Sequence, residues 1–138
     1  MFHTLQDLYC WQKARDLTLL IYEKTGKLEE SYFKEELRSA SLIAMNNVAK
    51  GTAFCDEDDF CRCYEISISS CFKIENLTYL LEELNEMNPE DINRLREDAA
   101  DTRKEIISFY EFRTSRQIFK SDDDDEYLPP IIDFDSPK

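Results

Sequence analysis

The 138-residue chain contains only two glycines, Gly26 and Gly51, and four prolines. The tight turns of β-sheet proteins often need glycine for a left-handed backbone, so this scarcity disfavours a β-rich fold. Long helices with few connections need little glycine. The composition is otherwise globular, with 42% hydrophobic and 12% aromatic residues. A chain of this length corresponds to about one domain.

Basic residues are also scarce: 17 Lys and Arg stand against 30 Asp and Glu, which gives a net charge of −13. Proteins that bind nucleic acid usually present a basic face, because neutralising phosphates releases counterions. Residues 121–138 hold seven acids and one base, yet residues 1–120 are acidic without them, with 16 bases and 23 acids. The sequence therefore disfavours direct contact with nucleic acid.

Signals for export and membrane insertion are missing as well. The first ten residues, MFHTLQDLYC, lack the basic start and the apolar run of a secretory signal. No stretch approaches the ~18 consecutive apolar residues of a membrane span. The five cysteines are an odd number. We expect a cytoplasmic protein with reduced thiols and no membrane contact.

Residues that carry catalytic chemistry are few. His3 is the only histidine, and phosphate-binding loops, nucleophile elbows and Glu-x-x-His pairs are absent from the sequence. Cys61 and Cys63 form a C-x-C pair, but residues two apart on a helix point to nearly opposite sides, so they cannot easily share an ion. We interpret the cysteines as small core residues and expect no enzyme activity, no metal and no cofactor.

Two amphipathic helices are predicted in the first half of the chain, because apolar residues recur there at three-four spacing. The first covers 7–25, with Trp11 and Tyr22 on its apolar face. Gly26 follows it, where a left-handed residue is expected. The second runs from about residue 32 to residue 53. Its inward face takes either Ile43 or Ala44, and its small residues would let a neighbour approach closely.

Two more helices are predicted in the second half. The third follows an N-cap at Asp56 and spans roughly 32 residues, and the fourth starts with Asn88 as N-cap and Pro89 as its first residue. Beside its main apolar stripe the third helix carries a second one. This second stripe contains Cys63, Ile66, Leu77 and Leu80. Two stripes on one helix predict contacts on two sides, with the bundle core and with another subunit.

The four segments are joined by short connections, which predicts an all-α, antiparallel up-down-up-down four-helix bundle over residues 1–120. Arg38 and Asn47 lie about 180° apart on their helix, so they need not form one site. We interpret Asn47 as making a buried hydrogen bond and Arg38 a salt bridge. Trp11 and Tyr22 could stack on a ligand, but core packing is the favoured interpretation.

Residues 121–138 show no helical period and contain a Pro-Pro pair, which predicts an extended acidic tail. A calcium site is disfavoured, because the acids lack the spacers and the glycine of a calcium loop. The tail is either a solvated segment or a docking segment for a protein partner. Its candidate partner-binding residues are Asp122, Asp123, Asp124, Asp125, Tyr127, Leu128, Ile131, Ile132 and Phe134. The negative charge of the tail should repel it from the acidic bundle, so docking within the molecule needs a local basic or apolar groove.

The segment DLYCWQKARDLTLLIYEKT resembles the first helix of the four-helix-bundle family encoded in 23S ribosomal RNA intervening sequences. The matching residues are Asp7, Leu8, Trp11, Gln12, Lys13, Ala14, Leu17, Ile21, Tyr22 and Thr25. The second helix resembles the family at Leu37, Arg38, Ala40, Asn47, Ala49 and Gly51. SSCFKIE resembles the third helix more loosely. The resemblance covers about residues 5–115.

The resemblance implies a homo-oligomer, with a pentameric ring as the family arrangement. Relatives in diversity-generating retroelements are basic accessory partners of a reverse transcriptase, whereas Ser39 and Phe54 stand here where the family has basic residues. The leading hypothesis is a non-enzymatic, self-assembling scaffold or adaptor that presents its acidic tail to a protein partner. The alternative is an accessory subunit of a nucleic-acid enzyme such as a reverse transcriptase.

Overall fold

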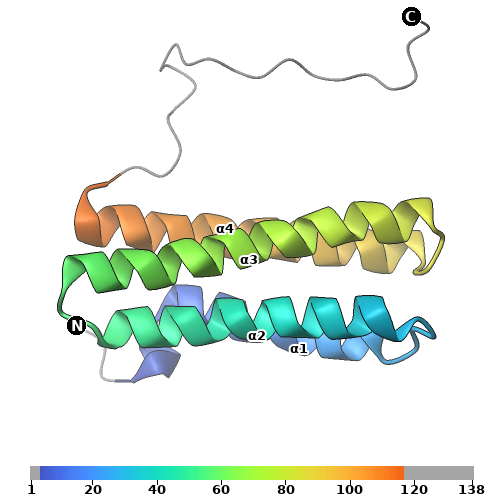
Figure 1. Cartoon of the computed structure of the whole chain (residues 1–138), viewed down its shortest axis with the longest axis horizontal. Helices are drawn as coiled ribbons and strands as arrows, with labels where there is room; N and C mark the ends of the chain where they lie inside the picture. The colour runs from blue at the N-terminus through green and yellow to red at the C-terminus, as the bar shows by residue number, and fades with distance from the viewer. Residues whose placement is uncertain (1–3, 117–138) are drawn as a thin grey trace, which may run out of the picture.

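A computed structural model describes residues 4–116, which form a four-helix bundle. Its elements are the 3₁₀ turn η1 (Leu5–Asp7) and the helices α1 (Tyr9–Thr25), α2 (Ser31–Ala53), α3 (Glu57–Glu83) and α4 (Pro89–Thr114). The helices lie side by side along the long axis, with α2 and α3 toward the viewer and α1 and α4 behind them (Figure 1). Each helix packs against the next along the chain, and α4 packs against α1. The predicted all-α, antiparallel bundle is confirmed.

The predicted starts of the last two helices are confirmed by their caps. The Asp56 carboxylate accepts a hydrogen bond from the backbone N–H of Asp59 at 3.1 Å. The Asn88 side chain accepts one from the N–H of Asp91 at 2.9 Å, and Pro89 is the first helical residue. These bonds satisfy N–H groups that have no partner within the helix, which fixes both starting points.

Helix α1 ends differently from the prediction. Gly26 has φ −58° and ψ −30°, so the expected left-handed conformation is wrong. The reason lies on α2. The Arg38 guanidinium donates hydrogen bonds to the Tyr22 carbonyl at 3.1 Å and to the Thr25 hydroxyl at 3.0 Å. Arg38 thus satisfies one terminal carbonyl of α1 from outside the helix, and the backbone N–H groups of Gly26 and Leu28 donate to two more, so α1 needs no left-handed cap.

Helix α3 is shorter than predicted, with 27 residues. Asn85 adopts a left-handed φ of 53°, and the N–H of Glu86 donates to the Leu81 carbonyl at 3.0 Å. This hydrogen bond across a left-handed residue is a common helix stop, and asparagine tolerates the conformation better than most residues. Helix α4 ends in the same backbone conformation at Ser115, with φ 59°.

The core consists of two clusters along the bundle axis. The cluster nearer the α1–α2 and α3–α4 connections includes Leu17, Ile21, Leu37, Ile74, Leu81 and Leu95. The cluster nearer the chain ends includes Val48, Phe60, Tyr64, Ile106 and Tyr110. Small hydroxyl side chains join neighbouring helices at the close approaches. The Ser67 hydroxyl donates to the Ala44 carbonyl at 2.7 Å, and the Thr102 hydroxyl donates to the Lys13 carbonyl at 3.3 Å.

Gly51 marks a close approach between α2 and α3. A Cβ atom placed on Gly51 would lie 2.7 Å from Cδ1 of Tyr64 and 2.9 Å from Cβ of Cys63. Only a residue without a side chain fits this contact. The predicted close approach of a neighbour to the second helix is confirmed, because Ala40 and Ala44 are also buried on α2.

Candidate functional site

Helices α2 and α3 share a face that exposes apolar side chains from both. Positions 32, 43 and 54 are eleven residues apart, about three helical turns, so they lie on one side of α2. Positions 66 and 80 are likewise on one side of α3. The six exposed apolar side chains, here called the α2–α3 patch, are Tyr32, Ile43, Phe54, Ile66, Leu80 and Leu84, each between 40% and 60% exposed.

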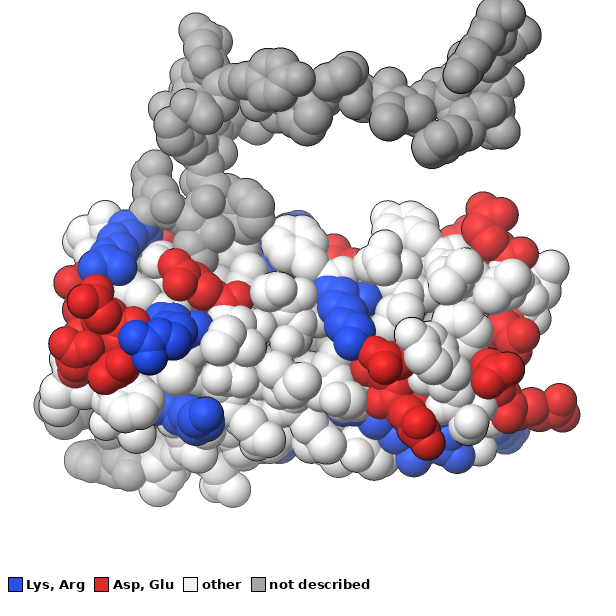
Figure 2. Space-filling model, viewed as in Figure 1, with Lys and Arg blue, Asp and Glu red and all other residues white. Residues whose placement is uncertain are grey.

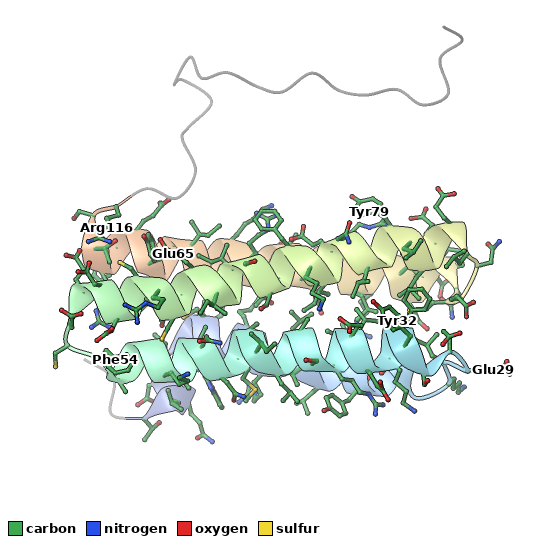
Figure 3. All side chains as sticks on the ribbon, in the orientation of Figure 1. Glu29, Tyr32, Phe54, Glu65, Tyr79 and Arg116 are labelled. Carbon is green, nitrogen blue, oxygen red and sulfur yellow. The ribbon has the colours of Figure 1, made fainter. Side chains whose placement is uncertain are left out.

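The α2–α3 patch carries little charge. Lys73 and Glu36 form an ion pair across it, with 2.5 Å between Nζ and Oε2. Figure 2 shows a broad white area across the middle of this face, interrupted by a few blue and red groups, with acidic groups gathered toward both ends. Figure 3 places Phe54 and Tyr32 at opposite ends of α2, so the patch runs along much of the bundle. Monomeric proteins rarely leave large continuous apolar patches in water, and such patches often mark protein interaction sites.

The predicted second stripe of α3 divides into buried and exposed members. Cys63 and Leu77 are each only 8% exposed and belong to the core. Ile66 and Leu80 are 43% and 44% exposed and lie on the patch. The two pairs differ by a rotation of about 60° around the helix axis, enough to move a side chain from core to surface. The subunit interface itself stays a prediction, and it depends on Ile66 and Leu80.

Asn47 and Arg38 have structural contacts that differ from those predicted. The Asn47 side chain donates to the Ile43 carbonyl at 2.9 Å, so its hydrogen bond stays within α2, and the residue is only half-buried. Arg38 makes the two bonds to α1 described above, and its guanidinium lies 4.4 Å from the centre of the Tyr22 ring. The predicted salt bridge of Arg38 is wrong, because carbonyl and hydroxyl oxygens take the place of a carboxylate.

The two aromatic residues predicted for the core of α1 lie at its edge. Tyr22 is 39% exposed, under the Arg38 guanidinium. Trp11 is partly buried against the core cluster nearer the chain ends, and the Arg15 guanidinium lies 5.5 Å from its ring. Both aromatic residues face the boundary between α1 and α2, whereas Ile21 and its neighbours fill the core. Core packing is therefore wrong for Tyr22 and only partly right for Trp11.

The boundary between α3 and α4 contains a repeated arrangement that the sequence interpretation missed. Each unit combines an arginine of α4 with an aromatic ring and a glutamate of α3. The two units are Arg103 with Phe72 and Glu75, and Arg96 with Tyr79 and Glu82. The available signal was a seven-residue spacing in both helices. The contacts within the two units fix how α3 and α4 are aligned.

Four of the five cysteines are buried, as the core interpretation predicts; Cys55 is exposed. Burial raises the pKa of Cys10 to about 11 and that of Cys71 to about 12. Both groups are therefore neutral thiols at pH 7, whereas catalytic and metal-binding cysteines act as thiolates. Within residues 4–116 no group of three or more His, Cys, Asp and Glu side chains could hold a metal.

These raised pKa values predict alkaline destabilisation. The unfolded thiols ionise near pH 9, whereas the folded ones remain protonated to pH 11–12. The folded state then binds more protons, so stability is full below pH 9 and falls as pH rises from 9 toward 12. Urea midpoints at pH 7.5–10.5 should fall, and the fall should be smaller for Cys71→Ala. Equal slopes for both proteins would contradict the assignment to Cys71.

Two small cavities lie at one end of the bundle. They measure about 150 and 170 Å³ and lie where the α1–α2 and α3–α4 connections meet, and both are lined by Lys24, Lys27 and Asp91. The Lys24 ammonium forms an ion pair with Asp91 at 3.1 Å. Pockets that enclose small molecules usually measure ~300–1,000 Å³. The groups that line these cavities form an ion pair, and the cavities are smaller than that range.

The remaining predicted site residues are outside the range of the structure. His3 and the nine candidate partner-binding residues between Asp122 and Phe134 lie outside the described residues. Among residues 4–116, no helix is both long and apolar enough to cross a membrane.

An antiparallel bundle of four helices with a mostly uncharged α2–α3 face defines the protein as a member of the helical-bundle class. The sequence model of the 23S rRNA-intervening sequence proteins matches residues 6–108. The chain belongs to this family, which confirms the resemblance drawn from its first two helices. A search of curated proteins finds no match to the chain.

Proposed function

We propose that this protein is a non-enzymatic scaffold that assembles with copies of itself through the α2–α3 patch and presents its acidic tail to a protein partner. The observation that carries the proposal is the patch of six exposed apolar side chains. Burying apolar surface contributes roughly 25 cal/mol per Å², so covering such a patch favours association. The centres of protein interfaces are also depleted in charged residues, as this face is.

The chemistry of the bundle supports a structural role over a catalytic one. The thiols of Cys10 and Cys71 are buried and protonated, and the arginines of the α3–α4 boundary are held by glutamates and rings. The polar groups near the surface cap or align helices. A scaffold needs this kind of fixed geometry.

The adaptor part of the proposal concerns the tail. A basic partner would be attracted by the run of acids from Asp122 to Asp125, because opposite charges speed encounter. The apolar residues from Tyr127 to Phe134 would then supply surface to bury. Such binding would weaken at high salt, since exposed charges are screened beyond about 8–10 Å at 0.10–0.15 M.

Self-assembly is tested by placing a charge in the patch. Leu80→Glu should dissociate the assembly, because an unpaired carboxylate cannot be buried in an apolar interface without a large penalty. We expect wild-type protein to have a mass several times 16.4 kDa by light scattering, with a ring of five as the arrangement implied by the family resemblance. The Leu80→Glu protein should have the monomer mass.

Leu19→Glu is the matched control. Leu19 is 62% exposed on α1, away from the α2–α3 patch, so the same change of residue should leave the mass unaltered. Circular dichroism would show that both variants remain folded. A wild-type protein that is monomeric at micromolar concentration would end the proposal, and so would a Leu80→Glu protein of unchanged mass.

A further inference from the structure

The net charge of the bundle is divided unevenly between its two helical hairpins. Residues 4–54, which include α1 and α2, hold seven basic and seven acidic side chains. Residues 55–116, which include α3 and α4, hold eight basic and sixteen acidic side chains. The tail, with its seven acids, is therefore repelled by the second hairpin and not by the first. The bundle as a whole is acidic, but its first hairpin has no net charge, so an acidic segment can dock there.

The neutral hairpin also offers exposed apolar surface. The Thr18 hydroxyl donates to the Ser41 carbonyl at 3.3 Å and marks where α1 meets α2. The next residue on each helix is an exposed leucine: Leu19 is 62% and Leu42 39% exposed. We call the surface around this contact the α1–α2 seam. It comprises Trp11, Arg15, Leu19, Tyr22, Arg38 and Leu42.

The seam combines apolar and cationic groups. Arg15 and Arg38 lie over the Trp11 and Tyr22 rings, at 5.5 Å and 4.4 Å from the ring centres. Arg15 also pairs with the exposed Asp16, whereas the guanidinium of Arg38 donates to the uncharged oxygens of Tyr22 and Thr25. An arginine that lies over an aromatic ring keeps hydrogen-bond donors at its edge for a carboxylate. A segment that carries both apolar and acidic residues fits this surface.

The chain beyond the described residues is long enough to reach the seam. Tyr127 is eleven residues after Arg116, and eleven residues span at most about 36–40 Å. Leu19 lies about 15 Å along the axis from the start of α1, and Figure 1 shows that α1 starts at the same end of the bundle where α4 finishes. Crossing two helices adds about 16–20 Å. The eight residues from Tyr127 to Phe134 span at most about 26–29 Å, which is enough to cover the roughly 17 Å between Trp11 and Tyr22.

We propose that the segment from Tyr127 to Phe134 docks on the α1–α2 seam of its own chain. The seam provides Leu19 and Leu42 for the apolar side chains and two guanidinium groups for the carboxylates. Docking hides the apolar part of the tail until a basic partner competes for it. This last consequence rests on the proposed function; the docking itself does not.

Trp11 makes docking measurable, because it is the only tryptophan and belongs to the seam. In the full-length chain, Ile131→Asp/Ile132→Asp should release the segment. We expect stronger quenching of Trp11 fluorescence by acrylamide and a red shift of its emission. Leu19→Asp should produce the same change from the other side of the contact. Leu19 is about 12 Å along α1 from Trp11, so the new carboxylate should not affect Trp11 directly. Combining both changes should add nothing further.

The control is Leu80→Asp, which alters the α2–α3 patch and should leave Trp11 quenching unchanged. Circular dichroism melting shows whether each variant is folded. Unchanged quenching in a folded Ile131→Asp/Ile132→Asp protein would overturn the docking proposal. Quenching that varies with protein concentration would overturn it too, because a second copy would then cover the seam. Light scattering reads assembly separately, so either proposal can fail while the other stands.

Discussion

Gly51→Val is expected to destabilise the bundle by about 3 kcal/mol, at the upper end of what an overpacked core usually costs. Even the first added carbon would lie 2.7 Å from the Tyr64 ring and 2.9 Å from the Cβ atom of Cys63. Valine adds two methyl groups beyond that point. Glycine is otherwise a poor helix former, by roughly 0.5–1 kcal/mol relative to alanine, so helix propensity alone would favour replacing it.

Relieving the clash by moving Tyr64 would be costly. Its side chain is fully buried, and its ring packs against Phe60 with 4.2 Å between ring centres and 31° between the ring planes. Its hydroxyl lies 2.7 Å from that of Thr52 and 3.8 Å from the sulfur of Cys10. Moving the ring would break these contacts inside the core. Either Tyr64 or the whole of α2 must shift, which explains the large expected cost.

Gly26→Ala is the natural control, because the chain has only these two glycines. A Cβ on Gly26 would meet only backbone oxygens, the nearest at 3.5 Å, and its φ of −58° suits any residue. We expect a stabilisation of about 0.4–1 kcal/mol through reduced freedom of the unfolded chain. Urea unfolding of both variants measures the contrast. A Gly51→Val protein as stable as wild type would show that α2 and α3 are not in close contact there.

The two glycines also show why local rules explain part of this fold. Capping chemistry predicted the starts of α3 and α4, because Asp56 and Asn88 act on N–H groups within three residues. The same rules failed at Gly26, because Arg38, twelve positions further along the chain, satisfies the end of α1. A contact that comes from another helix leaves no trace in the local sequence. Local signals therefore predict helix boundaries only where the capping groups are local.

The candidate site was predicted in outline and not in detail. Three-four spacing identified a second apolar stripe on α3, but it could not separate Leu77, at 8% exposure, from Leu80, at 44%. Both residues are apolar, and only the position of α2 decides which one is covered. On α2, spacing could not decide whether Ile43 or Ala44 faces inward, and the structure buries Ala44 and exposes Ile43. A small residue lies inside because the two helices are close, which spacing alone does not reveal.

Glu75→Ala is expected to cost about 2–4 kcal/mol, somewhat less than the 3–5 kcal/mol for breaking a fully buried ion pair. Arg103 Nε and a terminal nitrogen bond the two Glu75 oxygens at 2.7 and 3.1 Å. Both side chains are only 16% exposed, and the guanidinium lies 4.3 Å from the centre of the Phe72 ring. Without Glu75 the arginine keeps its charge in a place with little water.

The control for this change is an exposed ion pair on the same helix. Arg62 and Asp59 are 3.4 Å apart, with side chains 70% and 40% exposed. Removing Arg62 should cost no more than the roughly 0–1 kcal/mol that is typical of surface ion pairs. The difference between Glu75→Ala and Arg62→Ala therefore measures the effect of burial. Equal urea midpoints for these two variants would show that water screens the Arg103–Glu75 pair.

A double replacement separates the value of the pair from the penalty of an unpaired charge. Glu75→Leu/Arg103→Met removes both charges and keeps apolar volume in their place. We expect it to recover much of the stability lost in Glu75→Leu alone, because replacing a buried ion pair by apolar residues is often neutral or stabilising. The double variant should be closer to wild type than Glu75→Leu in urea unfolding. If instead the costs of Glu75→Leu alone and Arg103→Met alone simply add in the double variant, Arg103 and Glu75 stabilise the α3–α4 boundary independently of each other.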